Sequence, residues 1–159
     1  MSDIVLTRNV AALGDIKRLT DHGTSTAGGT GDATSITGLT IDREGFAGGS
    51  LPDSLLASVI FEATLASGAT LSVGYAVQDS ADNSSFADYQ TATYAVVATG
   101  PSGGGAVKGQ FNVPVNLTSA RRYTRFNYNP KCSSTGTDTT YSDGVGFFAG
   151  FDRLPASNA

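Results

Sequence analysis

The chain has 159 residues, of which 15% are charged, and its formal net charge is −4 at pH 7. That length suits a single domain, and the acidic balance excludes the broad positive field that nucleic acid requires. No apolar run approaches the roughly 20 residues that span a bilayer, and the first residues lack the pattern of a signal peptide. We therefore expect no nucleic-acid partner, no membrane partner, and synthesis in a reducing cytoplasm.

The first 34 residues are expected to lie outside the folded domain. Residues 1–34 would form an N-terminal arm that includes a flexible Gly/Thr-rich segment, since "HGTSTAGGTGDATS" has the composition of a linker. The domain itself is placed at 35–155, and a short tail follows at 156–159. Within the arm, the sequence predicts a weak strand at 3–7 and a short helical candidate at 10–19.

The middle of the chain alternates apolar and polar residues, the period-2 pattern of strands that bury one face. The pattern is strongest at 55–65 and 71–78, which flank the short turn "ASGA" and are expected to form an antiparallel hairpin. The same pattern returns at 107–117. There Pro114 falls among the polar positions, which predicts a strand at a sheet edge or with a bulge, because proline cannot donate to a ladder.

The remaining strands complete an all-β domain. They are expected at 35–42, 91–97, 121–129 and 144–154, with one helical turn at 117–120. About eight strands separated by turn clusters, with no long helix, predict an antiparallel β-sandwich of the jelly-roll type. The loops at 79–90 and 129–143 are expected to cross between the two sheets. Common parity predicts a core of Val59, Phe61, Leu65, Leu71, Val73, Tyr75, Val77, Phe111, Val113 and Val115.

The stretch "VQDSADNSSFADY" places Asp79, Asp82 and Asp88 within one loop. We interpret it as a turn in which Asp79, the first residue after the strand, bonds backbone amides, while Phe86 and Tyr89 return to apolar surroundings. A loose cation site and a catalytic carboxylate pair remain as alternatives. A helix-loop-helix calcium loop is excluded, since the stretch has neither its central glycine nor its closing glutamate.

No constellation for catalysis or for a cofactor is found. His22 has no cysteine or second histidine beside it in the sequence, and the lone Cys132 is interpreted as a passive thiol. Glu44 and Glu62 fall on separate segments, whereas glycoside hydrolysis needs two facing carboxylates. We therefore expect no enzyme, no cofactor and no metal.

Two features are candidates for an interface. Arg121, Arg122 and Arg125 form the only basic cluster, which either pairs with carboxylates of a neighbouring subunit or is a solvated strand face paired within the monomer. Phe147 and Phe148 are adjacent and so point to opposite faces of a strand. One of them is expected to face a partner, and we choose Phe148.

A strand ending in "VQDSADNSSFADY", then a Gly-rich break and "LTSARRYTRFNYN", resembles small structural proteins of tailed bacteriophages. The pattern is most similar to that of jelly-roll cement or decoration proteins on the outside of the capsid. Asp79, Asp82, Phe86 and Tyr89 match the loop pattern, and "ARRY" at 120–123 matches the late strand.

The resemblance implies a non-enzymatic virion protein on the capsid exterior. Such a protein would assemble as a dimer or trimer and would bridge subunits of the major capsid protein. Two alternatives remain open, another virion component such as a tail tube or tail completion protein, and a carbohydrate-binding jelly-roll module. The absence of tryptophan counts against the second alternative, because sugar rings stack best on exposed aromatic faces.

Overall fold

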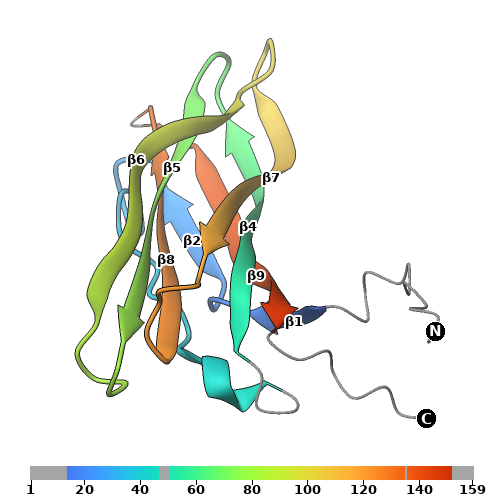
Figure 1. Ribbon diagram of the computed structural model, residues 1–159. Helices are drawn as coiled ribbons and strands as arrows, with labels where there is room; N and C mark the ends of the chain where they lie inside the picture. The colour runs from blue at the N-terminus through green and yellow to red at the C-terminus, as the bar shows by residue number, and fades with distance from the viewer. Residues whose placement is uncertain (1–13, 47–50, 135, 152–159) are drawn as a thin grey trace, which may run out of the picture.

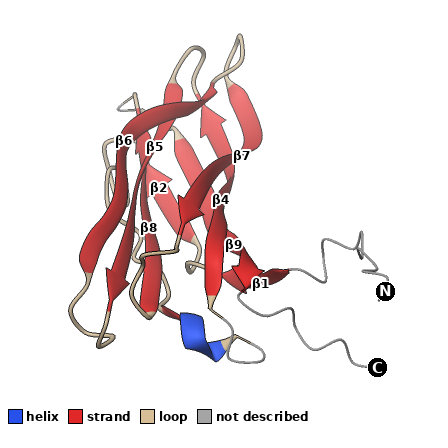
Figure 2. Cartoon of the chain, in the orientation of Figure 1, coloured by secondary structure: helices blue, strands red, loops and turns tan. Residues whose placement is uncertain are grey.

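The computed structural model describes residues 14–46, 51–134 and 136–151, and most of them are extended (Figures 1 and 2). The described ranges hold one short 3-10 helix at Arg43–Gly45 and nine strands: β1 Gly14–Arg18, β2 Gly23–Thr26, β3 Ile41–Asp42, β4 Pro52–Leu65, β5 Thr70–Ser80, β6 Ala87–Thr99, β7 Gly105–Asn116, β8 Tyr123–Cys132 and β9 Thr139–Phe151. The all-β prediction is therefore confirmed, and the strand expected at 3–7 lies outside the described residues. None of the helices in these ranges has the length and apolar character to cross a membrane.

The strands form two antiparallel sheets that pack face to face (Figure 2). The first sheet has the order β1-β9-β4-β7, with β2 also paired to β9, and the second has the order β3-β8-β5-β6. The first half of the chain thus pairs antiparallel with the second half, as in one long hairpin: β1 and β2 pair with β9, β3 with β8, β4 with β7, and β5 with β6. Successive pairs belong alternately to the first and the second sheet. A hairpin rolled in this way is a jelly roll, as the sequence predicted.

The core lies between the sheets and is filled by the inward parity of each strand. All the predicted core residues except Tyr75 and Phe111 are buried. Those two are half-buried, and their ring centroids lie 6.1 Å apart. Truncation of Phe111 should therefore cost less than truncation of a fully buried phenylalanine, contrary to the expectation from parity alone.

The prediction that 55–65 and 71–78 pair as a hairpin is wrong. β4 belongs to the first sheet and β5 to the second, and the turn between them, with a bond from the amide of Ala69 to the carbonyl of Ala66 (3.0 Å), carries the chain across the sandwich. Both strands share a buried parity because they face one core from opposite sides.

The loops expected to cross behave differently from one another. Residues 129–143 do include a crossing, from β8 in the second sheet to β9 in the first. The segment 79–90 does not cross, because β5 and β6 pair in the same sheet as a hairpin.

The N-terminal segment is folded where it is described. β1 and β2 both lie along β9, and between them Leu19 is buried in the core. The amides of Leu19 and Thr20 both reach the carbonyl of Gly144, at 2.8 and 3.3 Å. The predictions of a helix at 10–19 and of a flexible segment are therefore wrong for residues 14–26, which form β1, β2 and the connection between them. The strands form because β9 supplies a pairing edge that local composition cannot reveal.

The edge prediction for 107–117 is confirmed. Among the described strands, β7 ends the first sheet and pairs with β4 alone. Pro114 lies opposite Leu56 in that ladder without breaking it, since an edge strand has one side on which no donor is needed.

Candidate interaction surface

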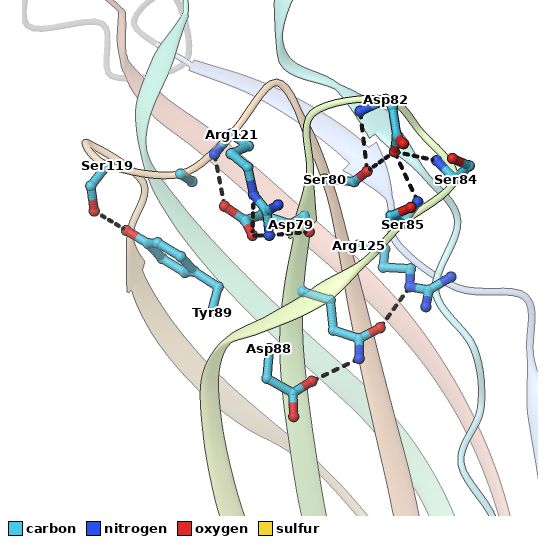
Figure 3. A network of polar contacts seen from close by, with 12 residues as sticks. Asp79, Ser80, Asp82, Ser84, Ser85, Asp88, Tyr89, Ser119, Arg121 and Arg125 are labelled. Atoms are coloured by element: carbon cyan, nitrogen blue, oxygen red, sulfur yellow. Dashed lines mark hydrogen bonds and ion pairs between the residues drawn. The ribbon is translucent and has the colours of Figure 1, made fainter.

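Asp79 and Arg121 join the end of β5 to the connection between β7 and β8 (Figure 3). The backbone amide of Arg121 donates to Oδ2 of Asp79 at 2.8 Å, and its Nε and Nη2 donate to Oδ1 at 3.0 and 2.6 Å. Only 7% of the Asp79 side chain is exposed. Burial by itself would raise the pKa of Asp79, but the hydrogen bonds from Arg121 outweigh it and hold that pKa below its ordinary value.

The other two arginines also have partners within the chain. Arg122 holds Asp42 through Nε (3.0 Å) and Nη2 (2.7 Å), and its Nη1 lies 2.8 Å from Glu44. Arg125 donates to Gln78 at 2.8 Å, and its guanidinium lies 4.0 Å from the centroid of the Phe86 ring. These contacts match the alternative in which the basic cluster is paired inside the monomer.

In the segment 79–89, the residue that holds the chain reversal by accepting backbone amides is Asp82 rather than Asp79 (Figure 3). Because β5 continues to Ser80, the reversal begins after the residue that we expected to cap it. Oδ1 of Asp82 accepts the amides of Ser84 and Ser85 at 3.0 and 2.8 Å and the hydroxyl of Ser80 at 2.8 Å. These donors, the Ser85 and Ser84 amides above all, lower the pKa of Asp82 well below its ordinary value.

The three aspartates of this stretch therefore face different partners. Asp79 binds Arg121, Asp82 binds the loop amides, and Asp88 accepts a bond from Nε2 of Gln78 at 2.7 Å. Tyr89 leaves the loop and donates its hydroxyl to the carbonyl of Asn116 at 2.6 Å. Within the described ranges, no three His, Cys, Asp or Glu side chains gather as a metal site. This arrangement supports the turn interpretation.

The remaining candidates lie apart from one another. His22 is exposed and stacks on Tyr141, with 5.3 Å between ring centroids. Cys132 is buried, and burial raises the pKa of its thiol to about 11, so the thiolate is scarce at neutral pH. The carboxylates of Glu44 and Glu62 lie 2.8 and 3.1 Å from Arg122 and Lys108 respectively.

Phe148 is misassigned as an interface residue. Its side chain is fully buried and packs against Phe46, with 5.0 Å between ring centroids. Its neighbour Phe147 points the opposite way and lies over Gly14, where an added Cβ would come within 2.2 Å of the ring. The alternation of strand residues correctly placed Phe147 and Phe148 on opposite faces of β9. Only the pairing of β9 with β1 and β4 shows which of these faces is the outer face of the sheet.

Phe147 belongs to an apolar row that crosses the outer face of the first sheet. The strand register places Ile16, Phe147, Leu56 and Pro114 directly opposite one another on β1, β9, β4 and β7. Ile16 is 70% exposed and Leu56 is 42% exposed. Paired residues point to the same side of a sheet, so the apolar row is a continuous band across four strands. Contiguous exposed apolar surface marks an interaction site more often than scattered residues do.

The apolar row is bordered by ion pairs and by a shallow hollow. Ile60, 50% exposed, extends the apolar surface along β4, and a cavity of about 240 Å³ lies between Ile60, Glu62, Lys108, Tyr141 and Asp143. Lys108 pairs with Glu62 at 3.1 Å and Arg18 with Asp143 at 3.7 Å. Charges on this face are therefore balanced locally, and the apolar band carries none.

The sequence contained a signal for this surface. In "LLASVIFEATL" Leu56 and Ile60 stand in the parity that should face water, beside the expected inward residues. A strand that is apolar on both parities is typical of burial on both sides. Ile16 had no such signal, since its segment was interpreted as part of a helix.

No protein-family model matches the chain, and no curated protein matches it. Similar solved structures include the VP2 subviral particle of infectious bursal disease virus, with 12% identity over 89% of this chain and 34% of that chain and a TM-score of 0.44. T=1 particles derived from infectious bursal virus give 12% identity, coverage of 89% and 33%, and a TM-score of 0.46. Dimeric latent PorU from Porphyromonas gingivalis gives 14% identity, coverage of 86% and 12%, and a TM-score of 0.44. The chain thus spans about a third or less of these proteins, and likeness at this level indicates no shared function.

Proposed function

We propose that this chain is a non-enzymatic structural protein of a tailed-phage virion, which decorates and cements the outer surface of the capsid. In this proposal it bridges subunits of the major capsid protein and acts as a dimer or trimer. The sequence resemblance and the jelly-roll topology support the class of protein, although a jelly roll by itself hosts many functions. The observation that carries the proposal is the apolar row on the first sheet.

The apolar row suits a protein that adheres to a flat protein surface. Its four residues lie on the outward face of the first sheet, and they present no charge that docking would have to desolvate. Interface cores are apolar and are rimmed by polar groups. The ion pairs Arg18–Asp143 and Glu62–Lys108 supply such a rim.

The tail-tube alternative is less well supported. A tube in which sheets continue between subunits needs open edge strands, whereas β6 contains register shifts at three places and β7 carries Pro114 and Lys108. Bulges, proline and lysine are the devices that block strand addition at an edge. Docking by a face rather than by an edge is therefore favoured.

Co-expression of the full chain with the major capsid protein of the same phage, followed by sedimentation of the shells, tests the proposal. The wild-type chain is expected to sediment with the shells at a fixed ratio. Leu56→Asp, which places a charge in the apolar row, is expected to abolish this. Thr64→Asp adds the same charge to an exposed outward position at the far end of β4 and is expected to sediment like the wild type. Shells that form without binding the wild-type chain would contradict the proposal.

A further inference from the structure

The outer face of the second sheet contains a groove that the proposed docking surface does not use. It has a volume of about 410 Å³ and lies over β8, β5 and β6. Gly74 and Ala76 form a floor of small residues beside the backbone of Ala92, and the polar side chains around it include Gln78, Asp88, Tyr94, Asn127 and Asn129. A concave site with a few converging polar groups is the usual form of a small-ligand site.

Two irregularities of the sheet create this groove. The register between β5 and β6 shifts at Gly74: Val73 pairs with Ala95, but Tyr75 pairs with Ala92, so β6 has one residue more in this interval. Such a bulge re-aims side chains, here in the region of Tyr94. A Cβ at Gly74 would lie 2.7 Å from Oδ1 of Asn129 and 3.5 Å from the Tyr94 ring. Glycine thus lets both side chains lie close above the strand.

Part of the polar lining is already satisfied within the protein. Asn127 accepts the amide of Gly38 at 2.8 Å and donates to Gln78 at 2.9 Å, and Gln78 donates to Oδ1 of Asp88 at 2.7 Å. These bonds fix the wall of the groove. The amide of Asn129 donates to the Tyr94 hydroxyl at 2.7 Å, which leaves the hydroxyl proton of Tyr94 available to a ligand.

The groups left for a ligand are one donor and two acceptors. The donor is the Tyr94 hydroxyl, and the acceptors are Oδ1 of Asn129 and Oδ2 of Asp88, which the bonds above do not engage. Arg125 and Asp88 both bond Gln78, so a positive charge lies close to the negative charge of Asp88. A matching ligand is uncharged, has several hydroxyl groups that both donate and accept, and has an apolar face for the small floor and the Tyr94 ring.

We propose that this groove binds a short neutral oligosaccharide. Pyranose rings combine vicinal hydroxyl groups with apolar C–H faces, which is the chemistry that the groove presents. The site lies on the sheet opposite the apolar row, so it would remain accessible on a protein docked through the first sheet.

Titration of the full, 15N-labelled chain with cellohexaose, maltohexaose and hexa-N-acetylchitohexaose, all of them neutral, tests the proposal by NMR. At least one of these is expected to give saturable shifts in the side-chain amide signals of Asn127, Asn129 and Gln78. Ala76→Arg places a long side chain on the floor of the groove, beside Asn127, and is expected to weaken binding roughly tenfold or more. Val96→Arg is the control, since Val96 pairs with Ser72 on the same outer face and is 61% exposed but does not line the groove, and it should bind like the wild type.

The proposal would be overturned by either of two results. One is the absence of saturable shifts with all three neutral probes. The other is binding confined to a cationic chitosan hexamer, which would show that the Asp88 charge alone attracts the ligand. Tyr94→Phe adds a check that does not depend on a bulky substitution: it removes the free hydroxyl donor, and the affinity is expected to fall while the fold, judged from backbone amide shifts, is retained.

Discussion

The outer faces of the two sheets differ in the interactions that their exposed side chains make. On the first sheet, the apolar row is exposed and the neighbouring charges form pairs such as Glu62–Lys108, with side chains 54% and 72% exposed. On the second sheet, Asn127 donates to Gln78 and accepts a bond from the backbone amide of Gly38. The first face can bind a partner with little cost in desolvation free energy, whereas the side chains of the second face are fixed by hydrogen bonds within the protein. One jelly roll thus carries a surface suited to adhesion and a surface suited to a defined groove.

The largest expected effect separates the inside of the first sheet from its outside. Phe148→Ala should lower the free energy of unfolding by roughly 3 to 5 kcal/mol, because it leaves a cavity in the core. Phe147→Ala, one residue earlier on the outer face, should cost about 1 kcal/mol, since the ring is only half-buried. Urea denaturation of both variants measures the difference. Equal losses would mean that the apolar row is structural and would weaken its assignment as a docking surface.

The next effect tests whether the polar wall of the second sheet is structural. Asn127 is 9% exposed, and its side chain bonds Gly38 and Gln78. Asn127→Ala should lower the free energy of unfolding by about 1 to 3 kcal/mol, because it leaves the Gly38 amide without its acceptor. Ser72→Ala on β5, outward but outside the groove lining, is a suitable control and should change stability little. A similar small loss in both variants would remove the distinction between the two faces.

The period of each strand could be predicted from the sequence, but the partner of each strand could not. Alternation identified the inward residues of β4, β5 and β7 because the pleat is a local property. The hairpin of β4 and β5 was wrong because pairing depends on contacts between distant segments. β2, with the sequence GTST, has almost no apolar signal and is placed by β9. Arg43 shows the same limit: it is 3% exposed and donates to the carbonyls of Ala120, Arg121 and Pro52, a position that no local pattern indicates.

The candidate surfaces divide in the same way. The chemistry of the loop at 79–89 could be predicted as a turn, since Asp, Asn and Ser favour such bonds, although Asp82 rather than Asp79 makes them. For the apolar row, the sequence indicated only the outward apolar parity of Leu56 on β4, because the four residues come from four strands whose register is set by the fold. The groove likewise depends on a bulge opposite Gly74.

A pH titration examines the junction of the two sheets, where Asp79 on β5 binds Arg121. Because the pKa of Asp79 is lowered in the folded state, its contribution to stability is fully present above the unfolded pKa, about 4, and is lost as pH falls through the folded pKa. The urea midpoint should therefore fall more steeply below about pH 4 for the wild type than for Asp79→Asn. Parallel curves would show that this pair does not contribute to acid sensitivity.

The smallest effect is expected at the ion pairs beside the apolar row. Glu62 and Lys108 lie opposite one another on β4 and β7, with 3.1 Å between charged atoms, but both side chains are more than half exposed, so water and salt screen their attraction. Glu62→Gln, Lys108→Met and the double variant should each change the free energy of unfolding by less than about 1 kcal/mol, with a coupling energy of roughly 0.5 kcal/mol or less.

If these ion pairs serve docking, the single variants should reduce the amount of protein that sediments with capsid shells more than they change stability. Raised salt should likewise weaken binding of the wild-type chain to the shells. A coupling of several kcal/mol in the isolated protein would show that this rim holds the first sheet together, and the contrast between an adhesive face and a self-bonded face would then fail.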